Sequence, residues 1–143
     1  MNVASILRQK GRAVTTVSPG TTLLDVANKL AAKRIGSIVI IGPKGKVAGI
    51  VSERDIIRAL SSQGPNCLTR PVSESMTREV VSCQESDTLD ELMALMTERR
   101  FRHLPVMADN ALVGIISIGD VVKHHVAEVT MEATAMREYI THS

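Results

Sequence analysis

Aromatic side chains are nearly missing from this 143-residue chain, which has no Trp and offers only Phe101 and Tyr139. Proteins that bind single-stranded nucleic acid stack the bases on such rings. Proteins that bind duplexes carry a strongly positive field, whereas the formal net charge here is only +2. Both observations disfavour a nucleic-acid partner. The core must be built from Ile, Val, Leu, Met and Ala.

Cysteine and long apolar runs are scarce as well. Cys67 and Cys83 are too few for a disulfide scaffold and do not occupy matching places in the chain. Apolar runs such as Ile38–Ile41 are far short of the roughly 20 residues that span a bilayer. The first residues show no signal-peptide pattern. We therefore expect a soluble, cytoplasmic protein without a membrane partner.

What the chain does have is an internal repeat. The segment Thr22–Leu30 recurs 66 positions later as Thr88–Met96, and Val47–Ile57 recurs 65 positions later as Leu112–Val122. Two copies of one unit in a short chain predict a pair related by pseudo-twofold symmetry. The cleft at the axis of such a pair is the expected place for a small ligand.

Each unit is expected to run strand, helix, strand, strand, helix, which is an α/β (α+β) fold. Apolar residues spaced three and four apart indicate the first helix, which Thr22 or Thr88 should cap. Two apolar runs separated by turn residues then indicate a hairpin. The expected strands cover residues 13–17, 37–41 and 46–51 in the first unit and 79–82, 103–107 and 111–116 in the second.

Each unit ends with the motif Gly-h-h-Ser-x-x-Asp, where h is a hydrophobic residue and x is any residue. Together with the run Phe101–Val106, these motifs resemble a tandem CBS-domain pair, also called a Bateman module. The resemblance implies two β-α-β-β-α units packed along their sheets, with adenosyl ligands bound in the clefts between them. It divides the chain into a first CBS repeat at 10–62, a second at 72–126 and a C-terminal amphipathic helix at 127–143.

A Ser-x-x-Asp motif closes each unit and marks what we call the first cleft, with Ser52 and Asp55, and the second cleft, with Ser117, Gly119 and Asp120. By residue type alone, Ser and Asp are good helix-capping residues. They also suit a ribose site, where Asp accepts hydrogen bonds from the 2′/3′ diol and the helix amides favour phosphate. The resemblance favours ribose, because CBS pairs carry their ribose-binding Asp at these positions.

Arg102 and His103 precede a strand in the second unit, where the first unit has Gly36 and Ser37. One interpretation is edge-strand charge that limits aggregation. The other is an anion site made of a guanidinium and a titratable imidazole. By resemblance to modules with a basic pair here, we expect the pair to contact phosphate in the cleft of Asp120.

Further ligand contacts are expected near the two clefts. Arg54 could supply positive charge in the first cleft. The extended segments that contain Thr15 and Val81 should border the adenine ring through main-chain groups, and Lys10 and Thr77 could reach a phosphate.

No metal site and no catalytic residue are expected. His124, His125 and His142 lack Cys or carboxylate partners at ligand spacing, and a solvated tail is their expected role. Ser117 and Asp120 have no nucleophile elbow beside them. The chain is therefore not expected to be an enzyme.

The leading hypothesis is a regulatory or sensor module that binds an adenine nucleotide (AMP or ATP) or NAD(H), forms a homodimer and acts on an unidentified regulated protein. S-adenosylmethionine offers a ribose diol but no phosphate, which Arg54 and Arg102 argue against. The alternative is a ligand-free structural dimerisation module. In either case the C-terminal stripe through Val129, Ala133 and Met136 is expected to add to the dimer contact.

Overall fold

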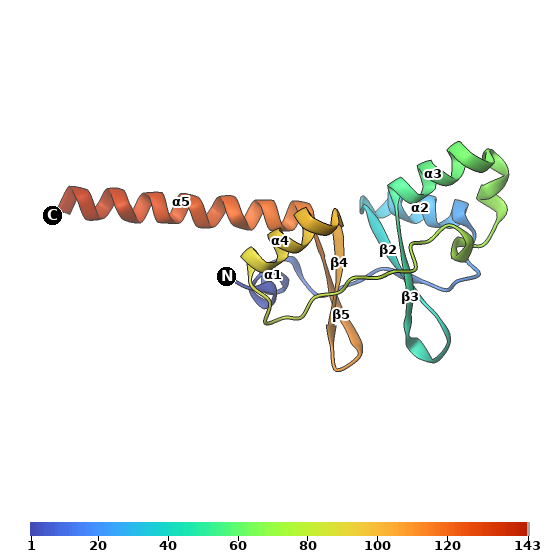
Figure 1. Ribbon diagram of the computed structural model, residues 1–143, viewed down its shortest axis with the longest axis horizontal. Coiled ribbons are helices and arrows are strands. Elements are labelled where there is room, and N and C mark those ends of the chain that lie inside the picture. The colour runs from blue at the N-terminus through green and yellow to red at the C-terminus, as the bar shows by residue number, and fades with distance from the viewer. Residues whose placement is uncertain (143) are drawn as a thin grey trace.

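The computed structural model describes residues 1–142, and it shows two similar units side by side with one long helix projecting from the second (Figure 1). Helix α1 (Val3–Lys10) precedes both units. The first unit contains β1 (Thr16–Val17), α2 (Leu23–Lys33), β2 (Ser37–Ile41), β3 (Val47–Ser52) and α3 (Glu53–Gln63). The second contains α4 (Leu89–Arg99), β4 (His103–Ala108), β5 (Ala111–Ser117) and α5 (Ile118–His142). Short 3-10 turns cover Pro43–Gly45, Pro65–Thr69 and Val72–Glu74.

Both predicted hairpins are present and in matching register. In the first unit β2 pairs antiparallel with β3, with Ser37 opposite Ser52, and β1 adds a parallel edge. In the second unit β4 pairs with β5, with His103 opposite Ser117. Each hairpin therefore ends where a helix begins with its Ser-x-x-Asp motif. The mixed α/β fold predicted from the repeat is confirmed.

The expected strand at residues 79–82 does not form, and its only trace is a parallel bridge between Cys83 and Val106. A hydrogen bond explains the difference between the units. In the first unit the amide of Val39 donates to the carbonyl of Thr15 (3.2 Å). The matching position in the second unit is Pro105, which has no N–H to donate. The ladder cannot continue past it.

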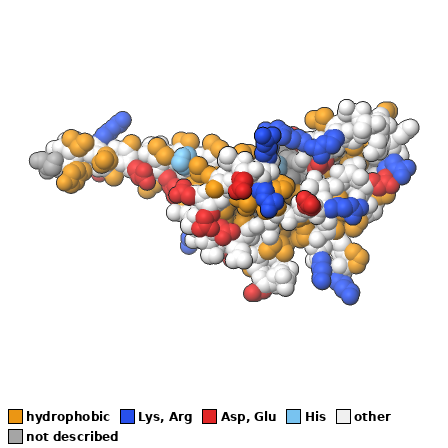
Figure 2. Space-filling view, in the orientation of Figure 1, with side chains coloured by type: hydrophobic (Ala, Val, Ile, Leu, Met, Phe, Trp, Pro, Cys, Tyr) orange, Lys and Arg blue, Asp and Glu red, His pale blue; other side chains and the backbone are white. Residues whose placement is uncertain are grey.

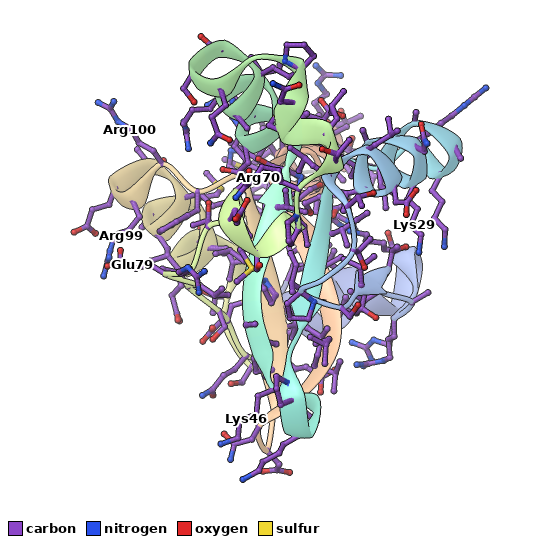
Figure 3. All side chains as sticks on the ribbon, turned by 90° about the vertical axis from the view of Figure 1, so that its right-hand side faces the viewer. Lys29, Lys46, Arg70, Glu79, Arg99 and Arg100 are labelled. Carbon is purple, nitrogen blue, oxygen red and sulfur yellow. The ribbon has the colours of Figure 1, made fainter. Side chains whose placement is uncertain are left out.

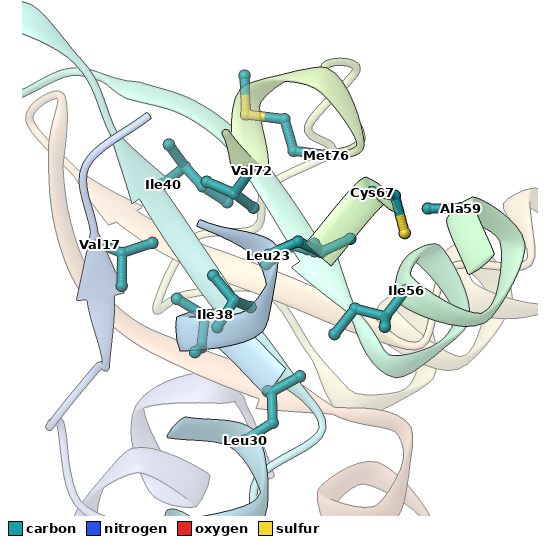
Figure 4. Packing of buried hydrophobic residues seen from close by; sticks show 12 residues of the cluster. Val17, Leu23, Leu30, Ile38, Ile40, Ile56, Ala59, Cys67, Val72 and Met76 are labelled. Atoms are coloured by element: carbon teal, nitrogen blue, oxygen red, sulfur yellow. The ribbon is translucent and has the colours of Figure 1, made fainter. Parts of the chain in front are cut away.

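Helix α1 was not predicted, and it completes the second unit although it begins the chain. Asn2 caps it by accepting a hydrogen bond from the amide of Ser5. Val3, Ile6 and Leu7 are at most 1% exposed and belong to the core of the second unit. The first unit has its own aliphatic core, whose members converge between the sheet and its helices (Figure 4).

Helix α5 joins what the sequence suggested were two helices into one of 25 residues. Its first turns pack on the body through Val121 (2% exposed) and His124 (6% exposed), so the expectation that His124 is solvated was wrong. Beyond Val129 the side chains that can be described are exposed. Because α5 runs through residue 126, the expected division between 72–126 and 127–143 falls inside one helix. The repeat boundaries at 10–62 and 72–126 stay predictions. Within residues 1–142, no helix is both long and apolar enough to cross a membrane.

Candidate functional site

A cavity of about 310 Å³ opens at the first Ser-x-x-Asp motif, and we call it the Asp55 cavity. Residues from both units line it, because the start of α3 faces the turn between α4 and β4. The lining consists of Gly36, Ile50, Ser52, Glu53, Arg54, Asp55, Arg58, Thr77, Arg100, Phe101, Arg102 and His103.

The Asp55 carboxylate is fixed in place although it lies in a cavity wall. Its Oδ2 accepts hydrogen bonds from the amide (2.9 Å) and the hydroxyl (3.3 Å) of Ser52. Its Oδ1 accepts from the Thr77 hydroxyl (3.2 Å) and from Arg58 (3.3 Å). The side chain is buried, with 6% exposed. One oxygen therefore holds the helix start, while the other faces groups that a ligand could displace.

Four arginines line the cavity that contains this carboxylate. Arg54 and Arg58 come from α3, whereas Arg100 and Arg102 come from the turn after α4. Arg100 adopts a left-handed conformation (φ 59°) that ends α4 and redirects the chain toward β4. Figure 3 shows Arg100 at this helix end, and Figure 2 shows Lys and Arg side chains gathered on the upper side of the body. Four guanidinium groups against the carboxylates of Glu53 and Asp55 leave the cavity wall with excess positive charge.

Arg102 and His103, which were expected in the second cleft, line the Asp55 cavity, and their contact with phosphate stays a prediction. The two units face each other, so the residues before β4 also reach the helix start of the other unit. They contact their own helix start as well, because the Arg102 carbonyl accepts a hydrogen bond from the Ile118 amide (2.8 Å). A Cβ atom on Gly36 would lie 3.0 Å from Nε2 of His103, so glycine leaves room for the imidazole. Burial lowers the pKa of His103, nearby Lys10 and Arg102 add to this, and Asp120 and Glu53 oppose it.

The second motif has the same local geometry but a different neighbour. Oδ2 of Asp120 accepts hydrogen bonds from the amide and hydroxyl of Ser117 (2.9 Å each). In the first unit Thr77 contacts Asp55. In the second unit Lys10 has this role, and its Nζ forms an ion pair with Oδ2 of Asp120 at 2.6 Å. Burial raises the pKa of Asp120, but hydrogen bonds from Lys10 and Ser117 outweigh burial and bring this pKa below its ordinary value.

The remaining predicted contacts are spread over the two units. The carbonyl of Thr15 already accepts a β-sheet hydrogen bond from Val39, and Val81 packs against the second core. Ser37 is 7% exposed, and Gly119 lies in the first turn of α5. Their roles as ligand contacts stay predictions.

Sequence reasoning missed five members of the cavity wall: Ile50, Glu53, Arg58, Arg100 and Phe101. Arg58 had a usable signal, because residues three apart on a helix share a face and Asp55 precedes it by three. The others depend on how the two units face each other.

Metal ligands and reactive thiols do not gather anywhere in residues 1–142. No group of three or more His, Cys, Asp or Glu side chains there could hold a metal ion. Cys67 and Cys83 are free and buried. Burial, together with Asp87, raises the pKa of the Cys83 thiol to about 12, so this thiol stays protonated at neutral pH.

Comparisons with known proteins identify the family and agree with the fold. The family described as "CBS domain" matches residues 4–62 and 72–127. The CBS domain-containing protein YhcV of Bacillus subtilis is 36% identical over 107 residues, which cover 75% of each protein. The crystal structure of the CBS-domain containing protein ATU1752 from Agrobacterium tumefaciens has 47% identity and a TM-score of 0.83, and the match covers 85% of this chain and 91% of that one.

A further structure is that of a CBS domain protein from Pyrobaculum aerophilum, PAE2072, complexed with AMP. It is 25% identical to this chain with a TM-score of 0.74, and the match covers 84% of this chain and 89% of that one.

Proposed function

Because this chain belongs to the CBS-domain family, we propose that it is a regulatory module that binds an adenosine nucleotide in the Asp55 cavity. The observation that carries the proposal is the combination, in one cavity, of a buried carboxylate and four arginines. A carboxylate suits the ribose diol, while guanidinium groups suit phosphate. The AMP complex of the related archaeal protein supports this choice of ligand class.

Each part of a nucleotide has a matching group in the cavity. Oδ1 of Asp55 exchanges its contacts with Thr77 and Arg58 for the ribose hydroxyls, and the freed Arg58 becomes available to phosphate. Arg54, Arg100 and Arg102 supply further positive charge. Ile50 and Phe101 offer apolar surface to the base. AMP and ATP, or the pyrophosphate of NAD(H), are therefore preferred over adenosine and S-adenosylmethionine.

The module is proposed to act as a homodimer that passes ligand occupancy to a regulated protein. Apolar side chains line a groove between α2 and α3, among them Leu30, Ile35, Ile56 and Ile57. Ile57 is 65% exposed, and Val122, its counterpart in the second unit, is 54% exposed. Exposed apolar surface at matching places in both units suits a symmetric contact with a second copy.

Nucleotide titration with a matched pair of variants tests the ligand. A ligand that binds only the folded state adds about 2.7 kcal/mol of stability at 100 times its dissociation constant. AMP, ATP and NAD should therefore raise the melting temperature of the parent. Asp55→Asn should remove most of this shift, whereas Asp120→Asn should retain it.

A parent without any shift would favour the alternative, a ligand-free dimerisation module. Equal loss in both variants would place the ribose elsewhere.

A further inference from the structure

One face of α5 carries an apolar seam with heptad spacing. Its members follow one another at intervals of four, three, four, three and four residues: Val122, Val126, Val129, Ala133, Met136 and Ile140. The five larger side chains are between 51% and 69% exposed. Alternating steps of three and four residues define the a and d positions of a coiled coil. Val126, Ala133 and Ile140 take position a, and the others take position d.

The opposite face of the helix is already used. Val121 and His124 pack against the body, and Glu128 forms an ion pair with the N-terminal amine (3.2 Å). These positions lie on the c and f side of the heptad, away from the seam. The body therefore fixes the orientation of α5 and directs the seam outward. Figure 1 shows the helix extending well beyond the body.

We propose that the seam pairs with the seam of a second copy of this chain in a parallel, in-register two-stranded coiled coil. The inference rests on the proposed homodimer for its partner and adds the contact that sets its orientation. The β-branched residues Val126 and Ile140 at position a suit two strands, and the proposed homodimer supplies two helices. A seam this short is weak alone, but contacts between the bodies raise the effective concentration of the two helices.

Charges beside the seam select the parallel orientation. In the parallel register, Glu132 at position g lies next to Arg137 at position e of the other helix, and symmetry forms this pair twice. The antiparallel register that matches the same apolar residues brings Glu132 next to its own copy. It also brings Lys123 next to Arg137. Opposite charges thus meet in one arrangement and like charges in the other.

Substitution on the two faces of α5 tests whether the seam is an interface. Met136→Glu places a charge in the seam, and Met131→Glu places the same charge at an f position that is 69% exposed. Sedimentation of the full chain should show the dimer weakened by about tenfold or more for Met136→Glu and unchanged for Met131→Glu. A dimer that neither variant changes overturns the coiled coil and leaves the proposed homodimer standing. A monomeric parent overturns both.

Charge reversal tests the orientation, because the two registers predict opposite signs. In a parallel coil Glu132→Lys and Arg137→Glu should each weaken the dimer by about three- to tenfold, and the double variant should restore it. In an antiparallel coil Arg137→Glu turns the like-charge contact with Lys123 into an attraction and should strengthen the dimer, whereas Glu132→Lys only replaces a Glu–Glu contact by a Lys–Lys contact and should change it little. Strengthening therefore overturns the parallel assignment.

Cysteine cross-linking gives an independent measure of register. Met136→Cys should form an intermolecular disulfide under mild oxidation, since equivalent d positions lie side by side only in the parallel register. Met131→Cys is the control and should not cross-link. The native Cys67 and Cys83 are buried and leave the background low. Equal cross-linking at both positions would overturn the proposal.

Discussion

Nζ of Lys10 lies 2.6 Å from Oδ2 of Asp120 and also donates a hydrogen bond to the carbonyl of Ile115 (2.8 Å). The contact joins the end of α1 to the start of α5, two segments 110 residues apart. It places an ammonium group at the carboxylate that would receive a ribose diol in the second cleft. The two motifs are alike in sequence, but the Asp55 carboxylate lies in a cavity lined by four arginines, whereas the Asp120 carboxylate is paired with Lys10.

Removing this ammonium group should change the titration of Asp120. In Lys10→Met we expect the pKa of Asp120 to rise, because burial then acts without the largest opposing interaction. In the parent, the lowered pKa of Asp120 stabilises the folded protein at pH values above the unfolded-state pKa of about 3.9. This contribution is lost as the pH falls through the pKa of Asp120 in the folded protein. The variant should therefore be less stable near neutral pH and lose less stability on acidification.

Carboxyl-carbon NMR titration measures the shift directly, and Lys33→Met on α2 serves as the control. An unchanged Asp120 titration in Lys10→Met would show that the ion pair is absent in solution.

His103 should report phosphate in the Asp55 cavity. Its pKa is lowered in the folded protein, so the neutral form stabilises the fold above about 6.5, and that contribution is lost as the pH falls toward the folded-state pKa. A phosphate nearby favours the charged imidazole and should raise this pKa. NMR titration of the ring should show the rise with AMP and no rise with adenosine. An identical response to both ligands would place the phosphate away from His103.

Neighbouring arginines at the end of α4 offer a test of phosphate recognition. Arg100 lines the cavity, whereas Arg99 lies outside its lining, and Figure 3 shows both at this helix end. Charge-assisted hydrogen bonds contribute about 1.5–3 kcal/mol, less where solvent screens them. Arg100→Gln should therefore weaken ATP binding by about tenfold and adenosine binding little. Calorimetry with Arg99→Gln as control decides it, and equal losses in the two variants would contradict the cavity assignment.

Local structure could be predicted from the sequence because the repeat shows the same helix and hairpin patterns twice. The hairpins and the helices capped by Thr22 and Thr88 depend on residues close in the chain, and they lie where periodicity placed them. Helix α1 was missed because its apolar residues are matched by a core more than 70 positions away. That Arg102 also lines the Asp55 cavity was not predicted, for a related reason. Periodicity shows that two units exist but not which surfaces they turn toward each other.

A glycine in each unit makes the closest approach to its surroundings, and the two should respond differently to substitution. A Cβ on Gly49 would lie 2.6 Å from Sδ of Met76 and 2.8 Å from the carbonyl oxygen of Thr77. That carbonyl accepts a hydrogen bond from the amide of Ile50 in β3 (3.0 Å). Moving the carbonyl away from Gly49 would break this hydrogen bond. A Cβ on Gly114 would have side-chain atoms of Leu7 as its nearest neighbours, the closest being Cδ2 at 2.7 Å.

Overpacking typically costs about 1–3 kcal/mol, and the cost falls where a flexible side chain can move. Gly49→Ala should therefore destabilise the protein more than Gly114→Ala. It should also weaken AMP binding, because the Thr77 hydroxyl contacts Asp55. Gly20→Ala is the control, since nothing lies within 4 Å of its Cβ position. Chemical denaturation and AMP titration of the three variants measure both effects. The prediction would be contradicted if Gly49→Ala and Gly114→Ala destabilised the protein equally and AMP binding stayed intact. The Thr77 backbone would then move aside as easily as the Leu7 side chain.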